Sequence, residues 1–94
     1  MLIKLGRVKV EVPDNFLDQN YRFGVARFRR IKELSGLSYT EFAKKYGFKS
    51  STVLGWAGYR KKGRVNNPNP STRVKLAFIE TELSQKVVEI RRVA

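Results

Sequence analysis

Residues 37–58 restrict what this chain can fold into more than any other segment, because they predict two short helices joined by a sharp turn. The first helix begins with a capping box, in which the Ser38 hydroxyl accepts a hydrogen bond from the Glu41 amide and the Glu41 carboxylate accepts one from the Ser38 amide. Ala43 is small enough to lie where two helices cross. Gly47 suits the left-handed residue of a tight turn.

The spacing of apolar residues completes this pair of helices. We expect the first helix to run from residue 38 to about residue 46, and the second to span about residues 50–57. The inner faces are predicted to carry Phe42, Tyr46, Phe48, Val53 and Trp56. The second helix would then stand at the surface, where an α-helix has the right width for a DNA major groove.

One further helix is expected on each side of this pair. An apolar residue at every third position predicts a first helix over about residues 20–35, closed by Gly36. These apolar residues are Val25, Phe28, Ile31 and Leu34. A similar stripe predicts a fourth helix over about residues 72–83, capped by Ser71 and Thr72. Its members are Leu76, Ile79 and Leu83.

The two ends of the chain have β character. Polar residues and Val alternate strictly from Arg7 to Val12, which predicts one strand or a small hairpin within residues 2–12, with Gly6 at a turn or bulge. Residues 86–93 are rich in β-branched side chains, and we favour a strand that pairs with the N-terminal one. A helix is the alternative, because Leu83, Val87 and Ile90 also form a helical stripe. The expected fold is a single, mainly α-helical domain over residues 1–94, with this short N-terminal strand.

The composition excludes several kinds of site. The chain has no Cys and no His, so it lacks thiol nucleophiles, zinc-finger ligands and the commonest general base. The two Gly-rich phosphate-binding patterns are absent as well, and we expect no enzyme activity, no cofactor and no metal. No apolar run approaches the roughly 18 residues of a membrane span. We expect a cytoplasmic protein of a prokaryote, or one at the nucleoid of a virus-infected host cell.

The charge points to an anionic partner. Twenty Lys and Arg residues against eight Asp and Glu residues give a net charge of +12, which suits nucleic acid, an anionic membrane surface or an acidic protein. Residues 42–79 contain no acidic residue at all. The nine basic residues of that stretch are Lys44, Lys45, Lys49, Arg60, Lys61, Lys62, Arg64, Arg73 and Lys75. A surface without carboxylates is what a phosphate backbone requires.

Together these residues resemble the helix-turn-helix of the lambda-repressor/Cro (XRE-like) family. The matching residues are Gly36, Leu37, Ser38, Ala43, Gly47, Phe48, Val53 and Trp56, with Phe28 and Ile31 in the preceding helix. The resemblance covers residues 28–58. The chain departs from the family pattern at Tyr39, where Gln is frequent, and in the twelve-residue step from Gly58 to Pro70. That step looks like a basic insertion, which forms a loop or a short wing hairpin.

The resemblance implies a lambda-repressor-like bundle of four or five helices that binds double-stranded DNA. The second helix of the pair would be the recognition helix, and its base-facing residues would be Lys49, Ser50, Ser51, Leu54 and Gly55. The start of the first helix of the pair would abut a phosphate through Ser38, Tyr39 and Thr40. The basic loop is expected to grip the DNA backbone or enter the minor groove. Its contact residues would be Tyr59, Arg60, Lys61, Lys62 and Arg64.

The predicted function is therefore sequence-specific regulation of transcription, and we expect a repressor. Family geometry implies a homodimer on half-sites about 34 Å apart. One alternative is an antitoxin-like protein whose terminal segments wrap a protein partner. Another is a non-specific architectural or RNA-binding protein that depends on charge alone.

Overall fold

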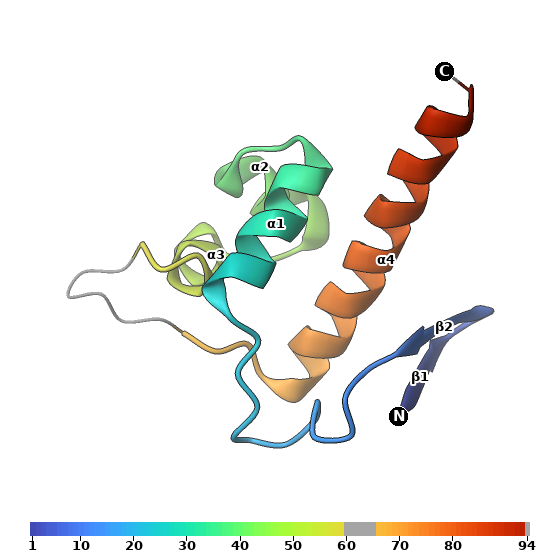
Figure 1. Ribbon diagram of the computed structural model, residues 1–94. Helices are drawn as coiled ribbons and strands as arrows, with labels where there is room; N and C mark the ends of the chain where they lie inside the picture. The colour runs from blue at the N-terminus through green and yellow to red at the C-terminus, as the bar shows by residue number, and fades with distance from the viewer. Residues whose placement is uncertain (60–65, 94) are drawn as a thin grey trace. The chain divides into compact units, whose positions relative to one another are not determined.

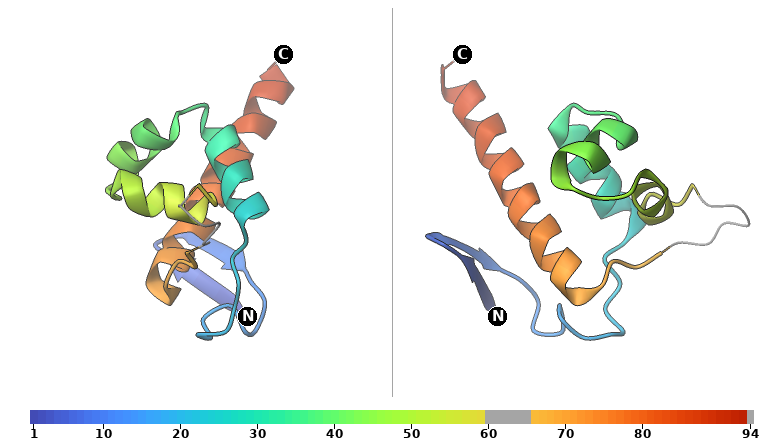
Figure 2. Two further views of the ribbon diagram at one scale, coloured as in Figure 1. Left: turned by 90° about the vertical axis from the view of Figure 1, so that its left-hand side faces the viewer. Right: turned by 180° about the vertical axis from the view of Figure 1, so that it is seen from behind.

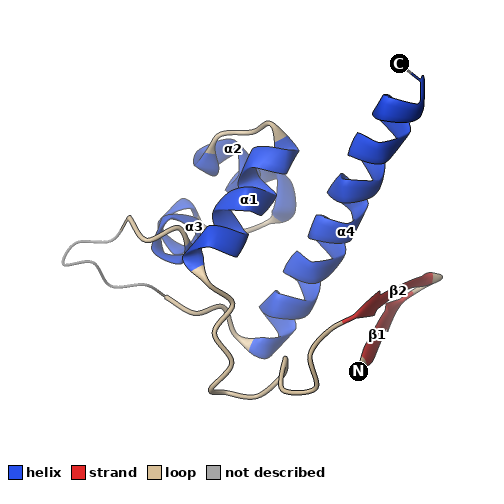
Figure 3. Ribbon diagram, in the orientation of Figure 1, coloured by secondary structure: helices blue, strands red, loops and turns tan. Residues whose placement is uncertain are grey.

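A computed structural model describes the backbone of residues 1–59 and 66–93, and the side chains of this part up to Lys86. Within it the fold is mainly helical, with four helices and one two-stranded antiparallel sheet (Figures 1 and 3). The chain divides into two compact units. One is residues 22–68, and the other combines residues 1–21 with residues 69–94.

The unit of residues 22–68 begins with α1, which spans Val25–Ser35. The sequence predicted a start near residue 20, and this is wrong. Gly24 has a φ of 95°, a conformation outside the helical region that glycine adopts readily. The first helical hydrogen bond, from the Phe28 amide to the Gly24 carbonyl, therefore makes Gly24 the N-cap. The predicted end is confirmed, since Gly36 caps α1 in the left-handed conformation.

Helices α2, Tyr39–Tyr46, and α3, Ser50–Trp56, follow as predicted. Both halves of the capping box are present: the Ser38 hydroxyl accepts from the Glu41 amide, and the Glu41 carboxylate accepts from the Ser38 amide, each at 3.2 Å. Gly47 ends α2 with a φ of 76°. A short turn then leads into α3, which packs against α2 (Figure 2).

The core of this unit is aromatic. Phe28 from α1 meets Phe42 from α2 edge to face, with ring centroids 5.6 Å apart, and meets Trp56 from α3 at 5.5 Å. Phe48, in the turn between α2 and α3, completes the cluster against Trp56 at 5.1 Å. Ala43 is also buried, as expected of a residue at a helix crossing. The predicted inner-face residues thus hold the three helices together.

The second unit begins with a β-hairpin made of β1, Leu2–Leu5, and β2, Val8–Glu11. Gly6 and Arg7 form the turn, so that the register pairs Leu5 with Val8 and Lys4 with Lys9. The hairpin interpretation of residues 2–12 is confirmed. The predicted pairing with a C-terminal strand is wrong, because β1 pairs with β2.

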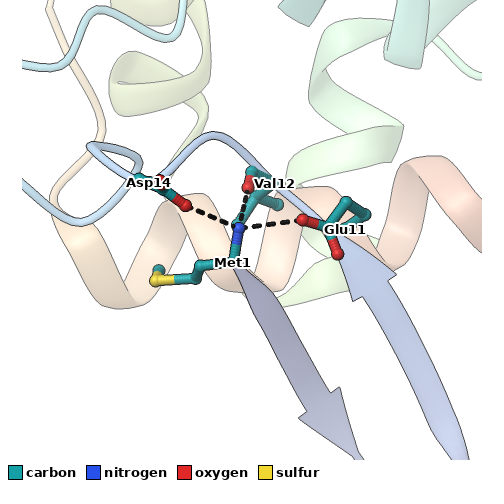
Figure 4. A network of polar contacts seen from close by, with 4 residues as sticks. All are labelled: Met1, Glu11, Val12 and Asp14. Atoms are coloured by element: carbon teal, nitrogen blue, oxygen red, sulfur yellow. Dashed lines mark hydrogen bonds and ion pairs between the residues drawn. The ribbon is translucent and has the colours of Figure 1, made fainter.

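The base of the hairpin is tied by the amino terminus (Figure 4). The Met1 amine donates to the Glu11 carboxylate at 2.8 Å, the Val12 carbonyl at 2.7 Å and the Asp14 carboxylate at 2.9 Å. Both carboxylates raise the pKa of this amine above its ordinary value. The Val12 amide returns a hydrogen bond to the Met1 carbonyl, which extends the ladder beyond the last strand pair.

Helix α4 spans Pro70–Val93, which makes it longer at both ends than predicted. Asn69, rather than Ser71 or Thr72, caps its start, because the Asn69 side chain accepts from the Thr72 amide at 2.9 Å. Pro70 suits the first helical position, where no amide donor is needed. The favoured strand over residues 86–93 is wrong, since the backbone stays helical there. The predicted apolar stripe of residues 76, 79 and 83 is buried.

Candidate nucleic-acid interface

Four of the predicted base-facing residues lie on an exposed face at the start of α3. Lys49 is the N-cap residue of α3, and it is exposed together with Ser50 and Ser51. Leu54, one turn further on, is 36% exposed. No side chain caps α3. The two serines therefore do not serve as caps, and within the part of the chain that the structure describes their hydroxyls remain open to a ligand.

The other side of α3 fixes this face in place. Val53 is fully buried, and Trp56 is 6% exposed. Both were predicted to belong to the core, and this is confirmed. Because these two residues anchor α3 against α1 and α2, the orientation of its exposed face is set by packing rather than by a flexible connection.

Gly55 does not have the position that the sequence predicted. It is buried, and its carbonyl accepts a hydrogen bond from the Asn66 amide at 3.2 Å. The segment after the basic loop returns to α3 at this point. Gly55 is therefore covered by the protein itself and does not face a groove, which corrects the prediction.

The start of α2 presents two of its three predicted contact residues. Ser38 and Thr40 are exposed, whereas Tyr39 is half-buried. The Ser38 hydroxyl accepts a hydrogen bond from the Glu41 amide, and its side chain also bonds to the Glu41 carboxylate, so Ser38 is part of the helix cap. The capping hydrogen bonds with Ser38 lower the pKa of Glu41 below its ordinary value of 4.5. The carboxylate of Glu41 is therefore part of the cap of α2.

A cluster of two tyrosines and two cations borders this region. The rings of Tyr39 and Tyr59 meet edge to face, with centroids 5.5 Å apart. The Arg29 guanidinium lies 4.7 Å above the Tyr59 ring, and Lys32 Nζ lies 4.9 Å from the centre of the Tyr39 ring. Burial, and after it the charge and hydroxyl of Tyr59, raise the pKa of Tyr39. We call these four residues the tyrosine–cation cluster.

Arg29 is the member that sequence reasoning missed. Its Nε donates to the Ala57 carbonyl at 2.9 Å, just beyond the end of α3. Thirty residues separate Arg29 from Tyr59, and no local pattern in the sequence signals that they meet. Tyr59 itself is 57% exposed, so an aromatic ring is available at the surface.

Of the predicted contact residues in the basic loop, the structure describes Tyr59. Arg60, Lys61, Lys62 and Arg64 lie outside the described residues, and so does the predicted tip of a wing hairpin at Lys62 and Gly63. Tyr59 marks the point where this segment leaves α3, and its amide donates to the Leu54 carbonyl at 2.9 Å.

Of the five basic residues of the acid-free stretch that the structure describes, one is not at the surface. Arg73 is 1% exposed, and its guanidinium donates to the carbonyls of Phe16 and Asp18. It therefore stabilises the fold and cannot contact a phosphate. Lys44, Lys45, Lys49 and Lys75 are exposed.

Neither a metal site nor a membrane span is found in the described part of the chain. There, no three His, Cys, Asp or Glu residues gather in a way that could hold a metal ion. No described helix has the length and apolarity needed to cross a bilayer. Comparisons of the sequence with models of protein families, and of the chain with curated proteins and with solved structures, found no match.

Proposed function

We propose that this protein is a sequence-specific double-stranded DNA-binding regulator of the lambda-repressor-like helix-turn-helix type, with α3 as its recognition helix. The observation that carries the proposal is the placement of α3. Its inner side is locked by Val53 and Trp56, while Lys49, Ser51 and Leu54 face outward with no acidic residue between positions 42 and 79. Such a helix suits a major groove, where it meets base edges beside two phosphate strands.

The side chains of α3 suggest which contacts would recognise bases and which would bind the DNA backbone. The hydroxyls of Ser50 and Ser51 bond to bases or phosphates with little discrimination, and Leu54 suits a thymine methyl group. Lys49 is the long cation of this face and suits a guanine edge or a phosphate. Because these contacts discriminate weakly, most of the affinity would come from the DNA backbone.

The tyrosine–cation cluster supports a backbone contact beside α3. Tyr59 is exposed and is fixed from below by Arg29 and from the side by Tyr39. A tyrosine held in this way offers its hydroxyl to a phosphate with little loss of side-chain entropy. The four basic residues between 60 and 64 would extend this contact.

The biological role follows from the family that the sequence resembles. We propose a repressor that binds a near-palindromic operator as a homodimer and blocks access to it. The antitoxin-like alternative, in which both ends await a protein partner, is disfavoured by the regular hairpin at residues 2–11 and the helix that continues to residue 93.

A non-specific architectural function is the second candidate. The observation that favours it is the scarcity of long polar side chains on α3, together with the exposed ring of Tyr59. The two functions differ in specificity rather than in affinity, because both depend on the same excess of positive charge.

Selection of bound sequences from a random duplex pool at about 150 mM salt separates the two. We expect a palindromic winner that binds at least about 10³-fold more tightly than a scrambled duplex. Absence of enrichment, with steep salt dependence on every duplex, would establish the architectural function instead.

A matched pair of variants then tests α3. Ser51→Glu places a carboxylate on the exposed first turn of α3, where the helix dipole tolerates it but a phosphate does not. We expect loss of at least about 100-fold in affinity for the selected duplex, measured by fluorescence anisotropy, with an unchanged melting temperature. Ser71→Glu makes the same change on the first turn of α4 and is expected to bind within about threefold of the wild type. Equal losses of affinity in the two variants would contradict the assignment of α3 as the recognition helix.

A further inference from the structure

The β-hairpin carries three cations that the proposed recognition helix does not use. Lys4 lies in β1, Arg7 in the turn and Lys9 in β2, and all three are exposed. The register places Lys4 directly opposite Lys9. Directly opposed residues have Cβ atoms roughly 5 Å apart, so two like charges there destabilise the hairpin.

No acid in the described part of the chain relieves this repulsion. Among the side chains that the structure describes, in residues 1–59 and 66–86, no ion pair involves Lys4, Arg7 or Lys9. The acid of the hairpin is Glu11, which lies at the end remote from the turn and is bonded to the Met1 amine at 2.8 Å. The turn end of the hairpin is therefore a cluster of three uncompensated positive charges, which we call the hairpin cations.

The hairpin that carries these cations is fixed at the end opposite the turn. The Met1 amine bridges Glu11, Val12 and Asp14, as Figure 4 shows. Val12 is 4% exposed, so the chain beyond β2 is anchored. Because the strands are already paired and fixed at one end, a partner that binds at the turn does not have to order the backbone.

The two faces of the hairpin differ in character. The alternation of side chains puts Lys4 and Lys9 on one face and Ile3, Leu5, Val8 and Val10 on the other. The open edge of β1 suggests pairing with a second copy of the chain. A lysine in the middle of an edge strand opposes such pairing, and Lys4 has this position. The charges thus favour an anionic partner over a second β1.

We propose that the hairpin cations bind backbone phosphates of double-stranded DNA, as a second contact besides α3. This rests on the proposed function, because both elements take the same ligand. A two-stranded ribbon fits the major groove, and three cations at its end can each neutralise a phosphate. The contact carries no sequence information, so it contributes affinity and salt dependence rather than specificity.

The experiment measures how the affinity of the full chain for the selected duplex depends on salt. The variant Lys4→Gln/Arg7→Gln/Lys9→Gln loses the hairpin cations. Each phosphate contact contributes about 0.9 to the slope of log affinity against log salt. We expect the slope to fall by about 2.7, so that the wild type loses about 40-fold more affinity than the variant between 50 and 200 mM salt.

The matched control is Arg22→Gln/Arg30→Gln/Lys86→Gln, which removes three exposed cations outside the hairpin and gives the same net charge. Its slope is expected to stay within about 0.5 of the wild type. The hairpin variant is expected to melt at or above the wild-type temperature, because a repulsive pair is removed. If the hairpin variant melts at a lower temperature, the single substitution Arg7→Gln in the turn serves in its place. It is expected to lower the slope by about one third of the decrease expected for the triple variant.

Several outcomes would overturn the proposal. Equal slopes for both triple variants would mean that net charge alone matters. A change in sedimentation mass with an unchanged slope would assign the hairpin to a dimer. Loss of binding to vesicles of phosphatidylserine and phosphatidylcholine, again with an unchanged slope, would assign it to an anionic membrane surface. Failure of the recognition helix is distinguishable, because Ser51→Glu would then bind normally while the hairpin variant still lowers the slope.

Discussion

Arg73, near the start of α4, is 1% exposed although it is charged. Its guanidinium donates to the carbonyls of Phe16 and Asp18 and lies 5.5 Å from the centre of the Tyr21 ring. These bonds join residues more than fifty positions apart and close the segment between β2 and residue 21 onto α4. The same residue type thus has opposite roles in this chain. Arg7 is exposed at the turn of the hairpin, where we propose that it binds a phosphate, while Arg73 is buried and donates to the carbonyls of Phe16 and Asp18.

Removal of the Arg73 guanidinium should therefore destabilise the fold. Arg73→Met keeps most of the aliphatic volume but leaves the two carbonyls without this donor. We expect a loss of about 2–4 kcal/mol in the free energy of unfolding, measured by urea denaturation. The control Lys75→Met changes an exposed cation of the same helix and should stay within about 0.5 kcal/mol of the wild type. Equal effects of the two substitutions would mean that the buried bonds contribute nothing.

At the scale of elements, local chemistry predicts the structure well wherever it acts within a few residues. The capping box and Gly47 set both ends of α2, and the apolar spacing gave the inner faces of α2 and α3. The wrong predictions concern the start of α1 and the C-terminal tail. Gly24 was treated as a helix residue rather than as a cap, and the β-branched tail was assigned to a strand although it continues α4. Intrinsic helix propensity is a weak effect, so the low propensity of the β-branched residues does not prevent α4 from continuing through the tail.

The capping box should make the stability of α2 depend on pH. The folded-state pKa of Glu41 is lowered by its hydrogen bonds with Ser38, so its contribution is complete above the ordinary value of 4.5 and is lost as the pH falls through the lower folded-state value. Glu41→Gln lacks this titration. We expect the difference in melting temperature between wild type and Glu41→Gln to shrink below pH 4.5 and to stay constant from pH 5 to 7.

Ser38→Ala provides the complementary measurement on the same box. It removes the hydroxyl that accepts from the Glu41 amide, at a cost of about 1 kcal/mol that should vary little between pH 5 and 7. If the difference in melting temperature between the wild type and Glu41→Gln instead persists unchanged to pH 3, this result would show that the carboxylate charge does not stabilise the cap.

At the scale of the whole molecule, the sequence predicts the partner that we propose, but it does not predict all of the candidate surface. The exposed face of α3 followed from helical periodicity, because Val53 and Trp56 are one turn apart and point inward. The tyrosine–cation cluster did not, since Arg29 reaches Tyr59 only through the packing of α1 against the end of α3. Gly55 was misplaced for a similar reason, because residue 66 returns to cover it.

Operator geometry tests the proposed homodimer. Two recognition helices in one rigid dimer must meet half-sites on the same face of the duplex, about one helical turn apart. Insertion of five base pairs between the half-sites of the selected duplex rotates one of them to the opposite face. We expect the affinity, measured by electrophoretic mobility shift, to fall by about 100-fold or more, because only one of the two recognition helices can then meet its half-site. A monomeric regulator would bind both duplexes equally well, because each chain would then read its half-site independently of the other.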